Sequence, residues 1–210
     1  MRIAFYVSGN AGRLRKIIAR KEKYLSQVKL VISDSRNNCD IEKELKAYNI
    51  SYILLDYREL EGEKNIRLSN NILELLLQYK IDYCFSFGDH ILKGELLKCY
   101  KNRIINFHPS ILPFFKGRKA IDQAVSKKTF LVGCSAHFID EGVDTGMIIM
   151  QSVMPMEVFE LEGYDGILDT QLKLLDNLIL VINENRLQIC DNKVKIKGAD
   201  YTRKYLFPSI

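Results

Sequence analysis

Apolar residues along the chain alternate between short continuous runs and stripes at helical spacing. The short runs are rich in strand-forming residues, and they cover residues 3–7, 28–33, 50–55, 82–87 and 103–107. Helical patterns separate them, and these begin near residue 14 and cover 40–48, 66–79 and 92–100. Strands that alternate with helices are typical of βαβ units. The pattern therefore predicts an α/β fold, a Rossmann-like and mostly parallel twisted sheet with helices on both faces.

The pattern changes at residue 106. Pro109 and Pro113 exclude a regular helix or a central strand between Asn106 and Gly117, so this segment is expected to be a shaped loop at a strand end. Open α/β sheets bind their ligands at such ends. The remaining pattern predicts a helix at 120–125, strands at 132–139 and 147–151, a long helix from 163 and a charged tail around 194–196. We expect one domain over 1–210, with a C-terminal helix and tail from about 163.

The composition is that of a globular protein, with 47% hydrophobic and 27% charged residues and a formal net charge of +5. The chain has neither an apolar run long enough to span a bilayer nor a signal-peptide pattern, so we expect a cytoplasmic protein without a membrane partner. Its five cysteines form no CxxC pair, which disfavours a structural zinc site or a disulfide framework. The basic residues between 13 and 23 lack interleaved aromatic residues, so we expect a solvated helix face and no nucleic-acid partner.

Imidazole chemistry is limited to three histidines, His90, His108 and His137. Asn106 and His108 are two residues apart at a predicted strand end, so their side chains point to the same side. Asp144 lies in a turn between Gly142 and Gly146. An amide that stabilises an oxyanion, an imidazole that moves a proton and a carboxylate that assists it form a site suited to acyl-type transfer.

The turn from Ser8 to Arg13 follows the first strand and opens a helix, so its backbone N–H groups suit a phosphate. It has only Gly9 and Gly12 of the glycines in a dinucleotide fingerprint, and Asp34 is a candidate for the acidic residue that follows the second strand of such folds. A tight connection between strand and helix is the alternative interpretation.

Two segments resemble the folate-dependent formyltransferases, a superfamily with ribonucleotide, methionyl-tRNA and sugar branches. They are Asn106-Phe107-His108-Pro109-Ser110-Ile111-Leu112-Pro113 and the stretch from His137 through Asp144 to Gln151. The resemblance implies the formyltransferase fold and an N-formyltransferase that uses 10-formyltetrahydrofolate as cosubstrate and needs no metal. It implies Asn106, His108 and Asp144 as catalytic residues, with His137 supporting them.

The same resemblance implies the binding residues. The folate pocket is expected from the stretch after the fourth strand and from the acidic loop, namely Phe87, Gly88, Asp89, His90, Ile91, Leu92, Asp140, Gly142 and Val143. The amine acceptor is expected at the first turn and the proline loop, namely Ser8, Gly9, Asn10, Gly12, Arg13, Pro109 and Ser110.

The acceptor is expected to be a small anionic molecule with a primary amine. The chain has Ala11-Gly12-Arg13 where the ribonucleotide branch has G-S-N, and Leu172 at the position expected for an acceptor-binding glutamate. Residues 116–121 resemble the R-G-x-x-P-I stretch of the sugar branch, with Ala120 in place of proline. We therefore expect a nucleotide-linked amino sugar. The alternatives are a phosphoribosylglycinamide formyltransferase of purine biosynthesis, a hydrolase of 10-formyltetrahydrofolate, and a non-catalytic nucleotide- or folate-binding module. A homodimer is left open.

Overall fold

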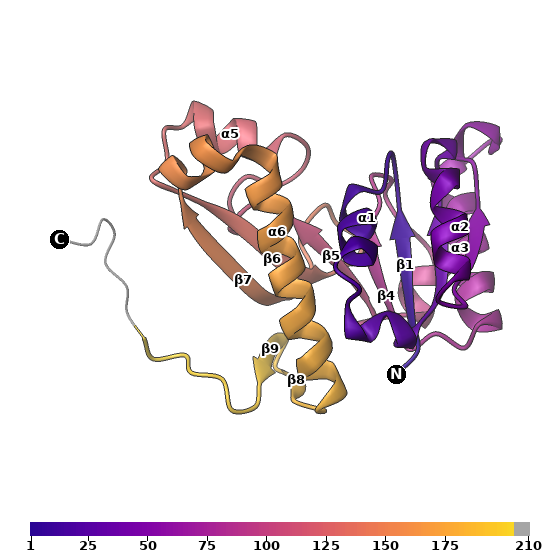
Figure 1. Ribbon diagram of the computed structural model, residues 1–210. Coiled ribbons are helices and arrows are strands. Elements are labelled where there is room, and N and C mark those ends of the chain that lie inside the picture. The colour runs from indigo at the N-terminus through magenta and orange to yellow at the C-terminus, as the bar shows by residue number, and fades with distance from the viewer. Residues whose placement is uncertain (204–210) are drawn as a thin grey trace.

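The structure is a computed structural model that describes residues 1–203, so residues 204–210 of the predicted tail lie outside the described part. Its centre is a seven-stranded sheet in the order β3-β2-β1-β4-β5-β6-β7 (Figure 1). The strands are β1 (Ile3–Val7), β2 (Val28–Ser33), β3 (Ser51–Leu54), β4 (Tyr83–Phe87), β5 (Ile104–His108), β6 (Leu131–Phe138) and β7 (Ile148–Pro155). Strands β1 to β5 are parallel, and β6 and β7 are added antiparallel. The predicted α/β class with a mostly parallel sheet is confirmed.

Helices cover both faces of this sheet. They are α1 (Gly12–Ala19), α2 (Glu42–Lys46), α3 (Lys64–Gln78), α4 (Glu95–Cys99), α5 (Ala120–Ser126) and α6 (Met156–Asn183), with 3₁₀ turns at Lys23–Gln27, Arg36–Ile41 and Tyr57–Glu59. In β1, Phe5 packs with α1 and α6, whereas Tyr6 packs with α3 and α4. Successive side chains of a strand point to opposite faces, so a central strand that is buried on both faces reads as one apolar run.

Helix α6 begins at Met156, seven residues before the predicted start. Gly163 interrupts it with a φ of 62°, a left-handed conformation that glycine adopts at little cost, so the prediction found only the second helical part. That second part packs against β6 and β7, and Leu172, Leu175 and Leu178 are buried there.

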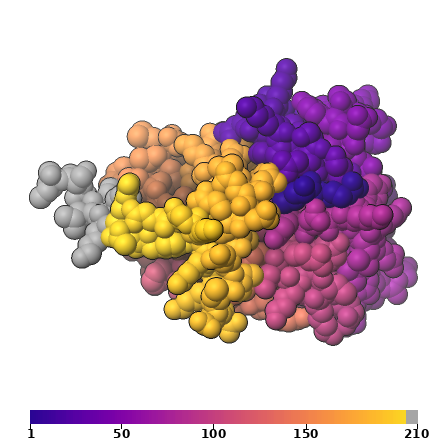
Figure 2. All heavy atoms as spheres, turned by 90° about the horizontal axis from the view of Figure 1, so that it is seen from below, coloured from indigo at the N-terminus to yellow at the C-terminus, as the bar shows by residue number. Residues whose placement is uncertain are grey.

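The predicted charged tail contains a hairpin, β8 (Leu187–Cys190) and β9 (Lys193–Ile196). Its turn residues Asp191 and Asn192 have φ values of 49° and 56°, as a two-residue hairpin turn requires. Figure 2 shows the hairpin and α6, yellow to orange, next to the indigo N-terminal part of the chain.

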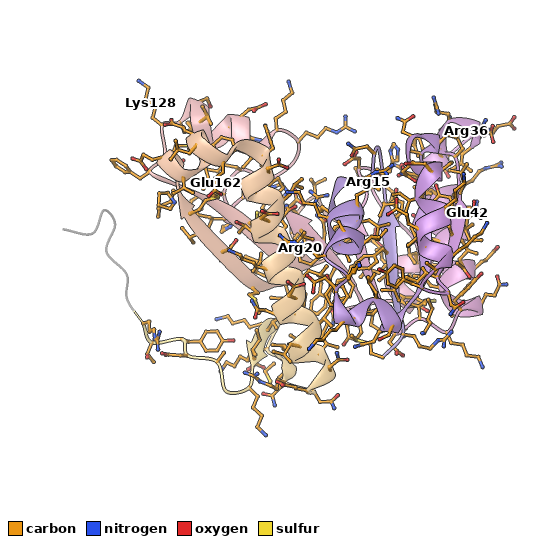
Figure 3. The ribbon with its side chains drawn as sticks, in the orientation of Figure 1. Arg15, Arg20, Arg36, Glu42, Lys128 and Glu162 are labelled. Carbon is orange, nitrogen blue, oxygen red and sulfur yellow. The ribbon has the colours of Figure 1, made fainter. Side chains whose placement is uncertain are left out.

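The basic residues of α1 take part in ion pairs at the surface. Arg15 pairs with Asp40 at 2.7 Å, and Arg20 pairs with Asp169 of α6 at 3.0 Å. Figure 3 shows Arg15 on α1 and Arg20 directly after its last residue, on the side toward α6. These ion pairs therefore connect α1 and the residue after it to the segment around Asp40 and to α6.

Two further findings concern membrane-spanning helices and cysteines. Within residues 1–203, no helix is both long and apolar enough to cross a membrane. All five cysteines are free thiols, and Cys84 and Cys134 are buried.

Candidate active site

Four polar side chains converge where β5 and β6 end. Asn106 of β5 lies opposite His137 of β6, and its Nδ2 atom is 3.3 Å from His137 Nε2. The Asp144 carboxylate, from the loop between β6 and β7, lies 3.3 Å from His108 Nδ1 and 3.5 Å from His137 Nε2. The residues predicted to act together are therefore brought together.

The loop that carries Asp144 is held by its own polar and small residues. Asp140 Oδ1 accepts hydrogen bonds from Gly142 N at 3.1 Å and from Thr145 Oγ1 at 2.6 Å. A Cβ atom at Gly146 would lie 1.9 Å from the Phe138 carbonyl oxygen, so only glycine allows this close approach. Asp144 itself has a φ of 51°, a left-handed conformation that Asp tolerates better than most residues. The conformation of this loop therefore places the carboxylate beside the two histidines.

The proline-containing loop after β5 is fastened to the antiparallel strands. Ser135 Oγ donates to the Ser110 carbonyl at 2.7 Å and accepts from Leu112 N at 3.0 Å. Gln151 Nε2 donates to the Leu112 carbonyl at 2.9 Å. The loop thereby presents two backbone groups to the site, the Phe115 carbonyl and the Gly117 N–H.

These backbone groups decide where the protons lie. His108 Nε2 donates to the Phe115 carbonyl at 2.8 Å, so its Nδ1 atom can donate to Asp144 only if the ring is doubly protonated. His137 Nδ1 donates to the Phe138 carbonyl at 2.8 Å. The Nε2 atom of His137 therefore accepts from Asn106 when the ring is neutral and donates to Asp144 when it is charged. His108 Nδ1 and His137 Nε2 therefore both face the Asp144 carboxylate.

The Asp144 carboxylate remains ionised to a lower pH than an ordinary aspartate. Burial by itself raises its pKa, but the hydrogen bonds from His137 and the Gly117 N–H at 2.8 Å, together with the charges of both histidines, outweigh burial and hold the pKa below its usual value. The site therefore keeps a negative charge next to a group that can hold a proton.

The four residues open into a cleft of about 1060 Å³ along the carboxyl ends of the parallel strands. Most of the predicted binding residues line it, namely Ser8, Gly9, Arg13, Gly88, Asp89, His90, Ile91, Leu92, Pro109, Asp140, Gly142 and Val143. This volume is large enough for two small substrates side by side.

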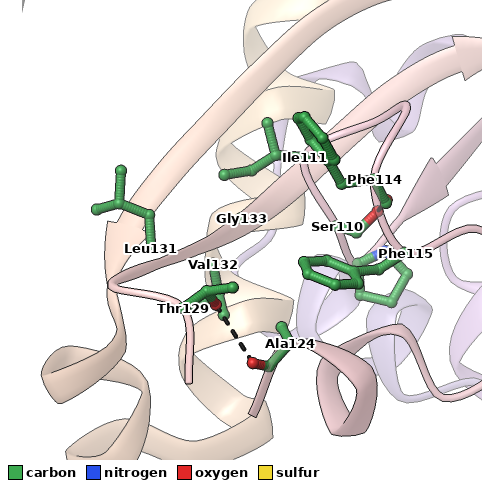
Figure 4. Close-up of a pocket in the computed structure, with 10 residues that line it drawn as sticks. Ser110, Ile111, Phe114, Phe115, Ala124, Thr129, Leu131, Val132 and Gly133 are labelled. Atoms are coloured by element: carbon green, nitrogen blue, oxygen red, sulfur yellow. Dashed lines mark hydrogen bonds between the residues drawn. The ribbon is translucent and has the colours of Figure 1, made fainter. Parts of the chain in front are cut away.

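Other predicted binding residues lie elsewhere. Phe87 packs on Phe5 in the core with its ring centre 5.4 Å away, and Asn10 Oδ1 accepts from the backbone of Gly12. Ser110 lines a separate apolar pocket of about 230 Å³ between the proline loop and β6, shown in Figure 4. Within the described chain, these residues and Gly12 are not part of the cleft lining.

The structure also corrects the interpretation of Leu172. This residue is 1% exposed and packs in the core, so it does not face the cleft. The preceding residue, Gln171, is the one directed toward the site: its Oε1 accepts from Arg13 Nε at 2.5 Å, and its Nε2 donates to the Phe107 carbonyl at 3.1 Å. The sequence signal that could have identified Gln171 is its polar side chain within the apolar stripe of the long helix.

Further residues without a predicted binding role also line the cleft. They include Asp34, predicted only as a candidate for the acidic residue of a dinucleotide fingerprint, and Ser35, Asn37, Tyr57, Arg58, Arg118 and Lys119. Most follow strand ends that are distant in sequence from the catalytic segments. No group of His, Cys, Asp and Glu within residues 1–203 is arranged to hold a metal ion.

Comparison with known proteins agrees with this arrangement. The sequence model described as "Formyl transferase" matches residues 1–164. The chain belongs to the formyl transferase family. The resemblance seen in the two segments is thereby confirmed, and so is the class of enzyme that it implied.

Individual relatives carry three different names. The chain is 30% identical over 159 residues to the phosphoribosylglycinamide formyltransferase of Bacillus subtilis, covering 74% of this chain and 80% of that protein. It is 31% identical over 158 residues to the formyltetrahydrofolate deformylase of Haemophilus influenzae, covering 74% and 55%. It is 29% identical over 159 residues to the human trifunctional purine biosynthetic protein adenosine-3, of which the match spans only 15%.

A solved structure shows the same fold. The glycinamide ribonucleotide transformylase 1 of Symbiobacterium toebii superposes with a TM-score of 0.79 at 26% identity, covering 93% of both chains. The similarity therefore extends over nearly the whole of this formyl transferase chain.

Proposed function

We propose that this formyl transferase moves a formyl group from 10-formyltetrahydrofolate to the primary amine of an acceptor that carries a phosphate. The observation that carries this proposal is the convergence of Asn106, His108 and Asp144 at one point of a cleft with room for two substrates. Family membership supports the transferred group.

The geometry suggests how each residue acts. The amine nitrogen attacks the formyl carbon, and the carbonyl electron pair moves to oxygen. The resulting oxyanion is stabilised by the Asn106 amide and by the His108 ring as N–H donor. Asp144 faces His108 Nδ1 and receives the amine proton through water. Asp144 then passes this proton through water to the folate nitrogen as the bond from carbon to that nitrogen breaks, which yields tetrahydrofolate and the formylated amine.

The two ends of the cleft suggest two binding sites. The Gly88 to Leu92 segment and the Asp140 to Asp144 loop both line the cleft, as expected for opposite walls of a folate pocket. Arg13 lines it at the first turn, where Gln171 holds its Nε atom and leaves the terminal nitrogens available for an anion. We place the acceptor phosphate there.

The names of the relatives favour phosphoribosylglycinamide over a nucleotide-linked amino sugar as acceptor. The burial of Leu172 removes one reason for doubting purine synthesis, since that position does not contact the cleft. Phosphoribosylglycinamide is therefore the first acceptor to test.

The test is a formylation assay with 10-formyltetrahydrofolate and a panel of amines, with products identified by mass spectrometry. The panel contains phosphoribosylglycinamide, nucleotide-linked amino sugars and a sample without amine. His108→Ala is expected to abolish formylation, and Asp122→Asn, a surface change, is expected to leave it intact. Failure to formylate any amine, or an active His108→Ala variant, contradicts the proposal. Formate released without any amine would instead support a deformylase, as named for one relative.

A further inference from the structure

The side chain of Gln123, in α5, contacts the proline loop without lining the cleft. Its Nε2 atom donates to the Lys116 carbonyl at 3.2 Å and to the Arg118 carbonyl at 3.0 Å. Its backbone N–H donates to the Lys119 carbonyl at 3.0 Å. The side chain is half-buried, and among residues 1–203 it does not belong to the cleft lining. Gln123 therefore holds three carbonyls on either side of Gly117 in the chain.

One of these carbonyls belongs to the same peptide group as the N–H that contacts Asp144. The Lys116 carbonyl and the Gly117 N–H are the two polar groups of the bond between residues 116 and 117, which is trans. In a trans peptide these two groups point in opposite directions within one rigid plane. Gln123 holds the carbonyl end, and the N–H end donates to Asp144 Oδ2 at 2.8 Å. Because hydrogen bonds in a chain polarise one another, the bond from Gln123 also makes this N–H a stronger donor.

The backbone of this segment has a conformation that needs such support. Phe115, Gly117 and Lys119 have φ values of 53°, 77° and 57°, so three left-handed residues follow at every second position. This conformation is unfavourable for residues with a side chain, and a glycine allows the peptide before it to rotate at little cost. The two bonds from the Gln123 side chain select the orientation in which the Gly117 N–H faces Asp144.

The orientation of this peptide affects the charge of Asp144. Burial raises the pKa of the carboxyl, whereas the hydrogen bonds from His137 and the Gly117 N–H, with the charges of both histidines, hold it below its usual value. The titratable and charged side chains of the strands and loops around the carboxylate are His108, Lys116, Arg118, Lys119, His137, Asp140 and Glu141. Gln123 is uncharged, so a neutral replacement leaves all of these charges in place.

We propose that Gln123 is a positioning residue that holds the peptide between residues 116 and 117 so that the Gly117 N–H faces Asp144. Gln123 lies outside the cleft and acts on the site through this backbone group. The inference rests on the proposed function for the part that Asp144 plays in formyl transfer. It extends the machinery of the site to α5.

The test replaces Gln123 by methionine, which has a similar length but no hydrogen-bond donor. Because the carboxylate then loses a hydrogen bond, Gln123→Met is expected to raise the pKa of Asp144, with about tenfold tighter binding of its proton. NMR titration of the aspartate carboxyl carbons measures this change, and Asp144→Asn identifies the signal. The kcat of formylation is expected to fall about tenfold, because Asp144 is held less firmly, while the KM values stay constant.

The matched control is Gln78→Met, the same change at the exposed last residue of α3. It is expected to leave kcat and the proton affinity of Asp144 within about twofold of wild type. If Gln123 contributed only to folding, Gln123→Met would lower the melting temperature and leave the pKa of Asp144 unchanged. An unchanged pKa in a folded Gln123→Met variant therefore overturns the inference.

A second variant decides the matter if Gln123→Met does not fold. Gln123→Glu keeps the shape and polarity of the side chain, but its carboxylate cannot donate to the two carbonyls. Its kcat is expected to fall about tenfold at neutral pH, and a wild-type rate overturns the inference. The pKa measurement needs no catalysis, so a raised pKa of Asp144 in a chain that formylates no amine would contradict the proposed function alone.

Discussion

Replacing Asp144 by asparagine removes a negative charge from the site while it keeps the size of the side chain. In the wild-type chain the carboxylate lies 3.3 Å from His108 Nδ1, with side chains that are 11% and 6% exposed. At an effective dielectric constant of about 20, opposite charges at this distance attract by about 5 kcal/mol. Desolvation of the two groups offsets part of that attraction. We therefore expect the substitution to weaken the stabilisation of a charged His108 ring by about 3 kcal/mol.

That loss corresponds to a fall of about 10²-fold in kcat, because the oxyanion is then stabilised by a neutral imidazole donor instead of a charged one. The amide oxygen of the Asp144→Asn variant can still accept from the Gly117 N–H, so the loop and both KM values are expected to change little. Initial rates of formylation at saturating substrates measure the effect, with Asp122→Asn as the control and thermal unfolding as the check on folding. A folded Asp144→Asn variant that keeps more than about a third of wild-type kcat would contradict the role assigned to this carboxylate.

Three further predictions concern the same site and its surroundings. Gly146→Ala must move the loop by more than about 1 Å, and we expect it to lower kcat by about 10²-fold. Formylation rates measure the effect, and a melting curve checks that the variant folds. An unchanged rate would show that the loop can shift without moving Asp144 out of place. Leu172→Ala is expected to lower the free energy of unfolding by about 2–5 kcal/mol in denaturant titrations while the acceptor KM stays constant. A large change in KM would indicate that Leu172 contributes to acceptor binding. The depressed pKa of Asp144 implies that its carboxylate stabilises the fold above about pH 4, the unfolded value, and that this stability is lost as pH falls through the lower folded value. The stability difference between wild type and Asp144→Asn should therefore shrink as the pH falls below about 4, and a difference that stays constant as the pH falls would contradict the assignment.

Most of the element pattern could be predicted because it depends on local rules. The apolar runs that became β1, β2 and β4 are buried on both faces, so they are visible without any knowledge of their neighbours. The elements that were missed depend on single residues. Gly163 divides α6, and the Asp191-Asn192 turn closes a hairpin within the predicted charged tail.

The residues that line the cleft were harder to predict than the three residues that we propose to be catalytic. Asn106 and His108 share a strand end, and Asp144 stands between two glycines, so each has a local signature. Gln171 has a different kind of role, since it reaches Arg13 from a position 158 residues away. The resemblance to the ribonucleotide branch instead put the position of an acceptor-binding glutamate at Leu172, the next residue of the helix, which is buried in the core.

The class of the fold, the family and the three residues at the centre of the site follow from the sequence alone, because strand periodicity and the two motif segments are local properties of the chain. The way in which protons are held there depends on the tertiary structure. The Phe115 and Phe138 carbonyls each accept a hydrogen bond from one ring nitrogen of a histidine, and the other ring nitrogen faces Asp144. The extent of the cleft depends on it too, because the alignment of β2, β1, β4 and β5 brings residues that follow four different strands to one edge of the sheet.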